Sequence, residues 1–423
     1  MTVAHDSRVV VVGQGYVGLP LAVRAVEVGH TVVGFDLDKD RVDRLRRADS
    51  FIDDITDDDL RAALDTGRYL PTDDATELAG FTTAVVCVPT PLRDGAPNLS
   101  FIEDAARLLA PHLRRGACVV LESTTYPGTT EEVFGPILDA GSGLRAGVDY
   151  QLGYSPERID PGNPTWGLQN TPKIVSGVDD ESGKAVAAFY DTVVDRTVAA
   201  PGVREAELAK LLENTFRHVN IALVNELAIY CHELGIDVWS VVDLAASKPF
   251  GFMKFTPGPG VGGHCLPIDP SYLSWQVRRA LGRTFRFVEI ANDVNDNMPG
   301  YVVTRIVEHL NRRRRAANGS RVLLVGLTYK RNSGDARQSP ATGVARRLVD
   351  LGAEVRAVDP RIAVDELPAN VELVACTPEV VADSDVVVVL ADHDEIDWQL
   401  LEQNADRVLD TRNRLTGTGV DRL

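Results

Sequence analysis

Cys265 lies in the segment best suited to covalent chemistry, GPGVGGHCLPIDPSYL at residues 258–273. Four glycines and a proline precede the thiol and allow the backbone to run close to a ligand. Asp269 and Pro270 have the form of a helix N-cap followed by proline at the first helical position. The helix dipole would then stabilise a thiolate, the reactive form of cysteine. A buried cysteine with Asp269 acting only as a cap explains the spacing equally well. No further Cys or His near His264 completes a metal site, so we expect no metal.

Lys210 and Asn214, in KLLENTFRHVN, stand one helical turn apart and project from one helix face. Such a pair can donate hydrogen bonds to a developing oxyanion. A solvated polar face is the alternative interpretation. Both residues lie opposite much of an apolar stripe, formed by Leu208, Leu211, Leu212, Phe216, Val219 and Leu223. The helical periodicity runs from Val203 to Leu234, so we expect this helix to bridge two domains or support a dimer interface.

Three glycines near the N-terminus, Gly13, Gly15 and Gly18, follow a valine-rich strand and precede a helix. Their G-x-G-x-x-G spacing permits a tight turn and brings backbone N–H groups close to a pyrophosphate at the helix N-terminus. Asp36 ends the next predicted strand, where an acid can accept hydrogen bonds from a ribose 2′-hydroxyl and disfavours a 2′-phosphate. The pattern predicts dinucleotide binding, with NAD preferred to NADP; a glycine-rich structural turn is the alternative.

Loops after further predicted strands are candidates for contact with nicotinamide or substrate. Apolar runs at residues 82–88, 117–122 and 149–156 extend the opening βαβ unit into a parallel sheet. In such a sheet, ligands bind at the carboxyl ends of the strands. VPTP (88–91), STTYPGTT (123–130) and GYSPERIDPGN (153–163) occupy these positions. Each could instead be an ordinary proline-containing turn.

A second α/β region begins after NRRRRAANGS (311–320), which we interpret as a connector with a solvated charge run at a helix end. RVLLVGLTYK and AEVRAVDP repeat the opening theme, with a strand ending in Gly326 and another ending in Asp359. The residues 385–391 and 407–410 predict later strands. We therefore expect two Rossmann-like, doubly wound parallel-sheet domains joined by a helical domain with one long helix. The predicted boundaries are 1–200, 201–315 and 316–423.

Bulk composition excludes several classes of partner. The 423 residues carry a formal charge of −17, which repels nucleic acid and anionic lipid. No apolar stretch approaches the ~20 residues needed to span a bilayer, and the first residues do not have the form of a signal peptide. The five widely spaced cysteines suit reduced thiols in the cytoplasm. We expect a cytoplasmic protein that binds neither nucleic acid nor membrane.

Taken together, the segments resemble the nucleotide-sugar 6-dehydrogenase family, which includes UDP-glucose and UDP-N-acetylhexosamine dehydrogenases. The resemblance runs nearly end to end through GQGYVGLPLA, VPTPL, ESTTYPGTT, SPERIDPGN, KLLENTFRHVNIALVNELA, PGPGVGGHCLPIDP, GLTYKRNSGDARQSP and DTRN. It implies an N-terminal NAD domain, a central helical dimerisation domain and a C-terminal domain that binds the nucleotide-diphospho-sugar. It also implies a homodimer formed through the central helix.

The resemblance implies a four-electron oxidation of a C6 alcohol to a uronic acid, with Cys265 as nucleophile through a thiohemiacetal and a thioester. Lys210 and Asn214 look like oxyanion stabilisers, and Asp269 and Thr124 like groups that handle water and protons. Glu157 resembles the family's glutamate near the reacting carbon. The expected cofactor contacts are Gly13, Gly15, Tyr16, Val17, Gly18, Asp36, Arg41, Val88, Pro89, Thr90, Thr124 and Arg337. The expected substrate contacts are Glu157, Arg158, Lys210, Asn214, Phe255, Gly260, Gly263, Tyr329, Lys330 and Arg412.

Two departures bear on the substrate. UDP-glucose enzymes typically carry GGSC and a second glutamate four residues after the first, whereas this chain has GGHC and Pro161. Both features resemble the N-acetylhexosamine branch, so a UDP-linked 2-acetamido sugar is expected, destined for a surface polysaccharide or a glycosylated metabolite. UDP-glucose or dTDP-glucose is the alternative within the family. A two-electron hydroxy-acid dehydrogenase and a catalytically silent nucleotide-binding protein are the alternatives outside it. Gln338 also replaces the usual acid of the family's RESP-like motif.

Overall fold

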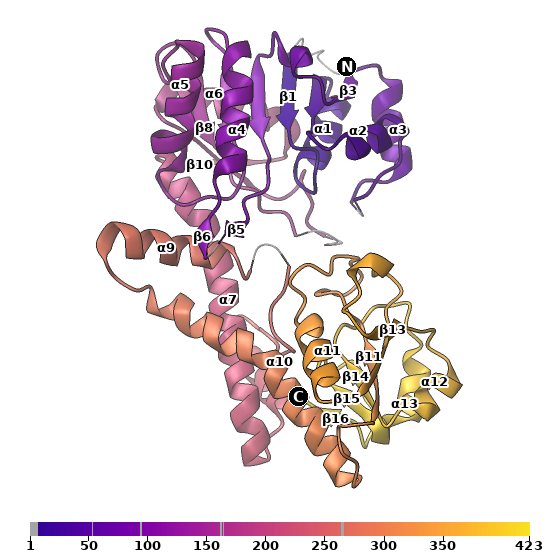
Figure 1. Cartoon of the computed structure of the whole chain (residues 1–423). Helices are drawn as coiled ribbons and strands as arrows, with labels where there is room; N and C mark the ends of the chain where they lie inside the picture. The colour runs from indigo at the N-terminus through magenta and orange to yellow at the C-terminus, as the bar shows by residue number, and fades with distance from the viewer. Residues whose placement is uncertain (1–6, 53, 94, 161–162, 164, 264–265) are drawn as a thin grey trace. The chain divides into compact units, whose positions relative to one another are not determined.

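The computed structural model describes residues 7–52, 54–93, 95–160, 163, 165–263 and 266–423. The chain folds into two compact units, Met1–Glu213 and Asn214–Leu423 (Figure 1). One helix, α7 (Val203–Leu234), begins in the first unit and ends in the second. The predicted 203–234 helix is therefore confirmed at both ends. The predicted boundaries at residues 200 and 315 remain a prediction.

The first unit is built on a sheet whose described strands include every strand predicted there. Its central strands are buried on both faces, which explains their continuous runs of valine. Strand β1 lies between β2 and β4, the point at which the strand order reverses. In spatial order the strands are β10 (Thr197–Ala199), β9 (Lys173–Gly177), β8 (Gln151–Tyr154), β7 (Cys118–Leu121), β4 (Thr83–Val86), β1 (Arg8–Val12), β2 (Thr31–Phe35) and β3 (Tyr69–Thr72).

One pair of strands runs against the rest of this sheet. Strand β9 is antiparallel to β8, with Gly153 opposite Gly177, and β10 is parallel to β9. The other neighbouring strands pair in parallel. The first residue of β9, Lys173, therefore lies at the edge where β7 and β8 end. The sequence pattern, which predicted parallel strands, did not indicate this reversal.

Helices cover both faces of the sheet, as a doubly wound fold requires (Figure 1). Helices α1 (Gly18–Glu27), α3 (Asp57–Asp65) and α6 (Asp180–Val193) pack on one face. Helices α4 (Ser100–Leu109) and α5 (Gly135–Ser142) pack on the other. Further elements of this unit include α2 (Lys39–Arg46) and the short hairpin of β5 (Leu92–Arg93) and β6 (Ala96–Pro97).

The second unit begins with helices α7, α8 (Val238–Ala246), α9 (Asp269–Leu281) and α10 (Arg286–Arg312). A buried polar row joins α7 to α10. The Asn225 Nδ2 donates to Asn295 Oδ1 at 2.9 Å, and the Asn295 Nδ2 donates to the His218 carbonyl at 3.3 Å. His218 Nε2 lies 2.8 Å from Asn292 Oδ1. Since buried polar groups are costly unless paired, this row fixes how the two helices meet.

The C-terminal sheet is parallel and confirms the second predicted α/β region. Helices α10 and α11 (Pro340–Asp350) cover one face, while α12 (Pro378–Asp383) and α13 (Trp398–Gln403) cover the other. The fold class predicted from the sequence is thereby confirmed. In spatial order the strands are β13 (Val371–Leu373), β12 (Glu354–Val358), β11 (Arg321–Val325), β14 (Val386–Val389), β15 (Val408–Asp410) and β16 (Asp421–Arg422).

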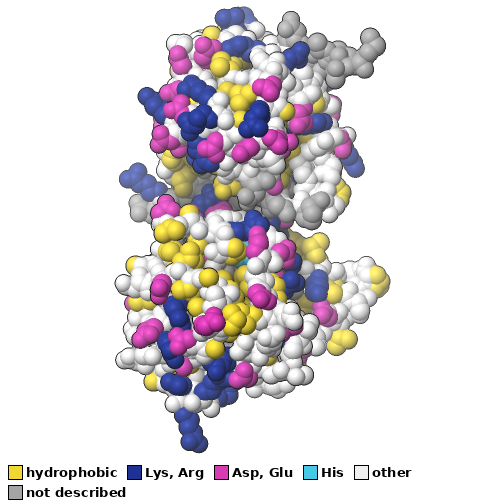
Figure 2. Space-filling model, turned by 90° about the vertical axis from the view of Figure 1, so that its right-hand side faces the viewer, with side chains coloured by type: hydrophobic (Ala, Val, Ile, Leu, Met, Phe, Trp, Pro, Cys, Tyr) yellow, Lys and Arg dark blue, Asp and Glu magenta, His cyan; other side chains and the backbone are white. Residues whose placement is uncertain are grey.

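The arginine-rich connector is tied to the C-terminal sheet domain. Helix α10 ends at Arg312, which pairs with Asp421, and the next arginine, Arg313, reaches Asp406 at 2.8 Å. The side chains of these two arginines are 55% and 31% exposed, so the segment is a solvated charge run at a helix end, as predicted. Figure 2 shows acidic and basic side chains interspersed on the face that it draws.

The second domain repeats the glycine-and-acid arrangement of the first and uses it differently. Gly326, after β11, has a φ of +83°. Asp359, after β12, accepts hydrogen bonds from the backbone N–H groups of Leu327 at 2.6 Å and Thr328 at 3.1 Å, and also from those of Arg361 and Ile362. His393 Nε2 lies 3.2 Å from the same carboxylate. Burial alone would raise the pKa of Asp359, but these donors outweigh it and lower the pKa to about 2.

The described residues contain neither a membrane-spanning helix nor a metal-binding cluster. None of the helices found there has the length and apolar character needed to cross a membrane. No group of three or more His, Cys, Asp or Glu side chains in the described part of the chain is arranged to hold a metal ion.

Candidate active site

The three glycines of the turn between β1 and α1 have different roles. Gly13 has a φ of +91°, and a Cβ there would lie 2.6 Å from the Cys87 carbonyl oxygen. A Cβ on Gly18 would lie 1.8 Å from the Gly13 oxygen, so these two glycines are required by the turn and by packing. A Cβ on Gly15 would meet nothing within 4 Å. The open space at Gly15 is where a pyrophosphate can approach the backbone, so the turn fits NAD.

Asp36 is buried beside this turn and fits the ribose end of NAD. One carboxylate oxygen accepts from the Gln14 N–H at 2.8 Å and from Arg41 Nη1 at 3.0 Å, and the other accepts from the Asp38 N–H at 3.0 Å. A carboxylate has about four acceptor positions, so capacity remains for a ribose hydroxyl. The structure therefore brings Gly13, Gly15, Gly18, Asp36 and Arg41 together, as the cofactor prediction requires.

The other expected cofactor contacts within the first unit gather at the same edge. Tyr16 is exposed and Val17 half-buried just before α1. Val88, Pro89 and Thr90 follow β4, and Thr124 follows β7. The Ser123 hydroxyl donates to the Val88 carbonyl at 2.8 Å and so fastens these two loops together.

Glu157 lies in the loop after β8 and is held as a carboxylate. It is 9% exposed, accepts a hydrogen bond from the Ile159 N–H, and has Lys173 Nζ 3.4 Å from its Oε2. Burial would raise the pKa of Glu157, but the charge of Lys173, its hydrogen bonds and the charge of Lys210 together lower it. Its neighbour Arg158 is held by other contacts, pairing with Glu213 at 2.6 Å and donating to the Pro172 carbonyl at 2.7 Å.

Helix α7 buries its polar face and exposes much of its apolar one. Lys210 is 7% exposed and Asn214 is 5% exposed, so the alternative of a solvated polar face is wrong. The Asn214 Nδ2 donates to Asp269 Oδ2 at 2.5 Å. Leu212 is 62% exposed and Leu223 is 60% exposed, whereas Leu211 is buried. In the first unit the charge of buried Lys210 acts on Glu157, and in the second unit buried Asn214 bonds to Asp269.

Asp269 does not serve as the predicted N-cap. Helix α9 begins at Asp269, and the preceding residue Ile268 occupies the cap position without a side-chain cap hydrogen bond. The carboxylate, which is 3% exposed, accepts from Asn214 instead. A tertiary partner thus prevails over the local capping pattern. Cys265 and His264 lie outside the described residues, so the covalent role and the thiol's place near the helix remain predictions.

The glycine-rich segment before Cys265 packs against the C-terminal loop that begins at Tyr329. The Gly263 N–H donates to the Arg337 carbonyl at 2.9 Å, and a Cβ on Gly263 would lie 2.8 Å from the Tyr329 ring. Gly260 has a φ of +129°, and its missing Cβ leaves room for Pro340. These contacts bring Gly263 and Tyr329 together, as the substrate prediction requires, while Gly260 lies against Pro340.

Arg412 and Phe255 flank the same segment. The Arg412 Nε donates to the Leu390 carbonyl at 2.7 Å, and a Cβ on Gly258 would lie 2.8 Å from Arg412 Nη1. Burial lowers the pKa of Arg412. Phe255 packs edge-on against Phe216 of α7, with ring centroids 5.7 Å apart. Lys330, next to Tyr329, is half-buried.

The predicted cofactor residue Arg337 and its neighbour have local structural roles. The Arg337 guanidinium donates twice to Asp335, at 2.8 and 2.6 Å. Gln338, which replaces the usual acid, is exposed and has a φ of +52°. The backbone at this position therefore lies in the left-handed region, and nothing in the described part of the chain explains the change of side chain.

Sequence reasoning missed the buried side chains that support these loops. Glu207 of α7 accepts from the Gly128 N–H at 2.6 Å, from the Thr130 N–H at 2.9 Å and from the Thr130 hydroxyl at 2.7 Å, and so clamps the loop of Thr124. Glu122, directly after β7, and Lys173 form a buried ion pair. The position of Glu122 after a strand could have indicated it, but the reversed strand concealed Lys173.

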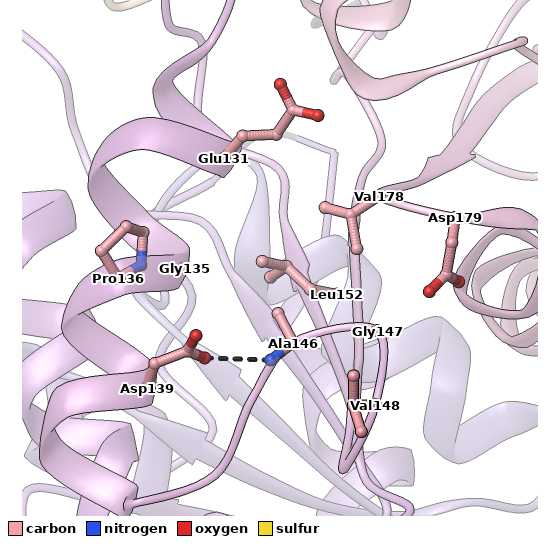
Figure 3. A pocket seen from close by; sticks show the side chains of 10 residues that line it. All are labelled: Glu131, Gly135, Pro136, Asp139, Ala146, Gly147, Val148, Leu152, Val178 and Asp179. Atoms are coloured by element: carbon pink, nitrogen blue, oxygen red, sulfur yellow. Dashed lines mark hydrogen bonds between the residues drawn. The ribbon is translucent and has the colours of Figure 1, made fainter.

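A separate pocket of 340 Å³ in the first unit contains none of the expected site residues (Figure 3). Its carboxylates have structural partners. Asp139 accepts from the Ala146 N–H at 3.0 Å and the Tyr150 hydroxyl at 2.8 Å, and Asp179 caps α6. Glu131 pairs with Arg204 at 2.6 Å. The pocket is therefore explained by local structure.

Comparisons with known proteins identify the family of the chain. The UDP-glucose/GDP-mannose dehydrogenase family matches through its NAD binding domain at residues 7–194, its central domain at 204–297 and its UDP binding domain at 323–417. The chain is 38% identical to a UDP-N-acetyl-D-glucosamine 6-dehydrogenase of Pseudomonas aeruginosa, over 85% of this chain and 84% of that protein. It is 33% identical to a UDP-N-acetyl-D-mannosamine dehydrogenase of Pyrococcus horikoshii, over 96% and 95%.

Solved structures give the same result. A UDP-D-ManNAc dehydrogenase from Pyrococcus horikoshii matches with a TM-score of 0.88 at 32% identity, over 98% of each chain. A UDP-glucose dehydrogenase from Pyrobaculum islandicum matches with a TM-score of 0.87 at 28% identity, over 99% of this chain and 96% of that one. The chain therefore belongs to the UDP-glucose/GDP-mannose dehydrogenase family and is an NAD-dependent oxidoreductase that acts on a nucleotide sugar.

Proposed function

We propose that the protein is a UDP-N-acetylhexosamine 6-dehydrogenase, which converts the C6 alcohol of the sugar to a carboxylate. The observation that supports this proposal most directly is that α7 buries Lys210 and Asn214 and that Asn214 bonds to Asp269. Buried donors of this kind are what an oxyanion-forming reaction needs. The GGHC motif, Pro161 and the names of the relatives from P. aeruginosa and P. horikoshii support the 2-acetamido sugar.

The proposed reaction consumes one alcohol, two NAD⁺ and one water, and yields one carboxylate, two NADH and three protons. NAD bound at the turn of Gly13, Gly15 and Gly18 would supply the acceptor for the two hydrides that leave C6. The Cys265 thiolate adds to the aldehyde formed by the first oxidation and gives a thiohemiacetal. Loss of the second hydride gives a thioester, which water hydrolyses to release the thiol and the acid.

The described residues have distinct proposed roles in these steps. Lys210 and Asn214 donate hydrogen bonds to the oxyanion that develops on the former C6 oxygen. Asp269, held by Asn214, and Thr124 handle water and protons. Glu157, held as a carboxylate, lies beside the reacting carbon. Tyr329, Lys330, Arg412 and the glycines of the thiol segment contact the substrate.

A substrate panel with counted NADH tests the proposal. Purified protein is incubated with limiting UDP-N-acetylglucosamine, UDP-N-acetylmannosamine, UDP-glucose or dTDP-glucose, and NADH is measured by absorbance. We expect turnover of a 2-acetamido sugar with two NADH per sugar. One NADH per sugar would exclude the four-electron mechanism. Cys265→Ser should abolish acid formation while NAD binding persists, and unchanged turnover would refute the covalent role.

UDP-glucose or dTDP-glucose oxidation is the second candidate. The structure of the P. islandicum UDP-glucose dehydrogenase matches with a TM-score of 0.87, almost the value of the ManNAc enzyme. The fold therefore supports both substrates, and the panel separates them. No turnover of any of these sugars by protein that binds NAD would favour a silent nucleotide-binding protein.

We further propose a homodimer formed through α7. Its exposed apolar face includes Leu212 and Leu223, and exposed Phe287 and Ile290 on α10 add to the apolar surface. A second copy of the chain would cover these side chains. Leu212→Asp should give a monomer in sedimentation, whereas Val148→Asp, at an exposed position in the first unit, should leave a dimer. A monomeric wild-type protein would refute this proposal.

The proposal also assigns NAD binding to residues 1–200, dimerisation to 201–315 and nucleotide-sugar binding to 316–423. A cytoplasmic location is proposed because the described cysteines are unpaired thiols, which suit a reducing compartment.

A further inference from the structure

A buried cluster of ionisable groups lies beneath Glu157, at the edge where β7 and β8 end. Its members are Glu122, Lys173 and Tyr190, with Cys87 beside them. The side chains of Glu122 and Lys173 are 0% and 4% exposed, and that of Glu157 is 12% exposed. Charged groups are rarely buried so completely unless they are paired, so this cluster requires a reason.

The reversal of β9 produces the cluster. Glu122 directly follows β7 and Glu157 follows β8, so both carboxylates lie at the carboxyl edge of the sheet. Lys173 is the first residue of β9, which runs antiparallel to β8. Had β9 been parallel, its first residue would lie at the opposite edge. The reversed strand therefore brings a lysine to the edge where the reaction is proposed to occur.

The contacts within the cluster form a chain that ends at Glu157. Tyr190 of α6 donates its hydroxyl to Glu122 Oε2 at 2.7 Å, and the Cys87 sulfur lies 3.8 Å from the same oxygen. The other oxygen of Glu122 accepts from Lys173 Nζ. Lys173 Nζ also lies 3.4 Å from Glu157 Oε2. Glu122 thus holds the ammonium group, and the ammonium group reaches Glu157.

The surroundings of Glu122 and Glu157 shift the pKa values of these two glutamates in opposite directions. Burial raises the pKa of Glu122 to about 7, with Lys173 opposing the effect in part. Burial would also raise the pKa of Glu157. The charge of Lys173, the hydrogen bonds of Glu157 to Glu122 and to the Ile159 N–H, and the charge of Lys210 together lower it. For Lys173, burial lowers the pKa, whereas the two carboxylates raise it and prevail. Two neighbouring carboxylates whose pKa values are shifted in opposite directions are typical of the acid and the base of an active site.

We infer that Lys173 is a positioning residue for the reaction, which keeps Glu157 ionised and oriented beside the reacting carbon while Glu122 and Tyr190 hold Lys173 in place. This inference rests on the role of Glu157 in the proposed function. Lys173 is not proposed to touch the substrate, because it acts through Glu157.

The test compares pH profiles of kcat/KM with the preferred nucleotide sugar for the wild type, Glu157→Gln, Lys173→Met and Lys173→Arg. Methionine keeps much of the volume of lysine and removes its charge. Glu157→Gln identifies the acidic limb that belongs to Glu157, because that limb disappears in this variant. In Lys173→Met the same limb should move up by at least one pH unit, since Glu157 loses its cation. Lys173→Arg should keep the limb near its wild-type position.

Two further measurements distinguish positioning from packing. The kcat of Lys173→Met should fall at least tenfold near neutral pH, while the Kd for NAD stays within twofold of the wild type. Lys184→Met removes an exposed lysine of α6 that pairs with Glu181, and it should change neither quantity. If Lys173→Met does not fold, Glu122→Gln provides the test. It removes the carboxylate that shares the charge of Lys173, while the glutamine amide can still donate a hydrogen bond to Glu157, so the limb should move to lower pH.

Each outcome decides one point. If Glu157→Gln turns over at the wild-type rate, the proposed role of Glu157 fails. If Glu157→Gln is slow but the limb stays fixed in Lys173→Met, or in Glu122→Gln where that variant replaces it, the inference about Lys173 is overturned. A fall in thermal stability with an unchanged pH profile would likewise assign Lys173 to packing alone.

Discussion

Replacing the glycines of the first turn one at a time should separate NAD binding from folding. Gly15→Ala adds a methyl group that meets nothing within 4 Å, at a residue whose φ is not positive. We expect its free energy of unfolding to change by no more than about 0.5 kcal/mol. Gly13→Ala adds the same methyl group at a φ of +91° and 2.6 Å from the Cys87 oxygen. The backbone strain alone costs ~1–2 kcal/mol, and the overlap adds to it.

The expected effect on NAD is the opposite of the effect on stability. The methyl group of Gly15→Ala occupies the space through which a pyrophosphate approaches the backbone. Losing one hydrogen bond to a charged group costs roughly 1.5–3 kcal/mol. Because every ~1.4 kcal/mol is tenfold in affinity, NAD should bind about 10- to 100-fold more weakly.

Two assays on the same preparations check this prediction. Calorimetric titration gives the Kd for NAD, and thermal unfolding gives the Tm. Gly15→Ala should keep the wild-type Tm and lose affinity, whereas Gly13→Ala should lower the Tm by at least ~4 °C. Wild-type NAD affinity in a stable Gly15→Ala variant would refute the assignment of this turn as the pyrophosphate site.

Three further predictions concern stability. Burial raises the pKa of Glu207 to about 7, so its protonated form favours folding, and stability should rise on the order of 3 kcal/mol as the pH falls from above 7 to about 4.5. Glu207→Gln should remove that part of the dependence of Tm on pH; an unchanged profile would contradict it. Asn225→Ala leaves the buried Gly258 N–H unpaired and should cost about 1–3 kcal/mol in urea unfolding, while Asn220→Ala, whose side chain bonds within the helix surface, should cost under about 1 kcal/mol. Equal losses would refute the difference. Burial would raise the pKa of Asp421, but His309, Arg305 and Arg312 lower it to about 2, so this group stabilises the fold above pH 4 and loses its effect as the pH falls toward 2. Asp421→Asn should therefore cost on the order of 1 kcal/mol at pH 7, since solvent screens this partly exposed group, and clearly less at pH 2; a constant cost would contradict the ionic role.

The sequence predicted the helices and strands far better than the direction in which neighbouring strands pair and the side-chain contacts that result. The strand, turn and helix around Gly13, the helix at 203–234 and the second α/β domain were read from short-range patterns, since each depends on residues a few positions apart. The direction of β9 could not be read in this way, because strand direction depends on the connection and on the packing of the whole sheet. Lys173 was therefore missed, although it lies beside the predicted residue Glu157.

Helix α7 shows why a correct element does not determine a correct environment. Its apolar stripe and its opposite polar face were both visible in the sequence. In the single chain, however, much of the apolar face is exposed and Lys210 and Asn214 are buried. Similarly, Asp269 matched a capping pattern, but its carboxylate bonds to Asn214, 55 residues away. Both outcomes depend on tertiary contacts that no local pattern contains.

The glycine-and-acid arrangement occurs twice in this chain, yet only one copy keeps room for a ribose hydroxyl. Asp359 already accepts from four backbone N–H groups and lies beside His393, so its acceptor positions are filled. In the second domain the acid instead accepts the backbone hydrogen bonds that hold its own loops. For protein engineering, the consequence is that grafting the glycine spacing of the first turn onto Gly326 would not create a second dinucleotide site. The hydrogen bonds from the Leu327 and Thr328 N–H groups to Asp359, at the start of the loop of Tyr329 and Lys330, would first have to be removed.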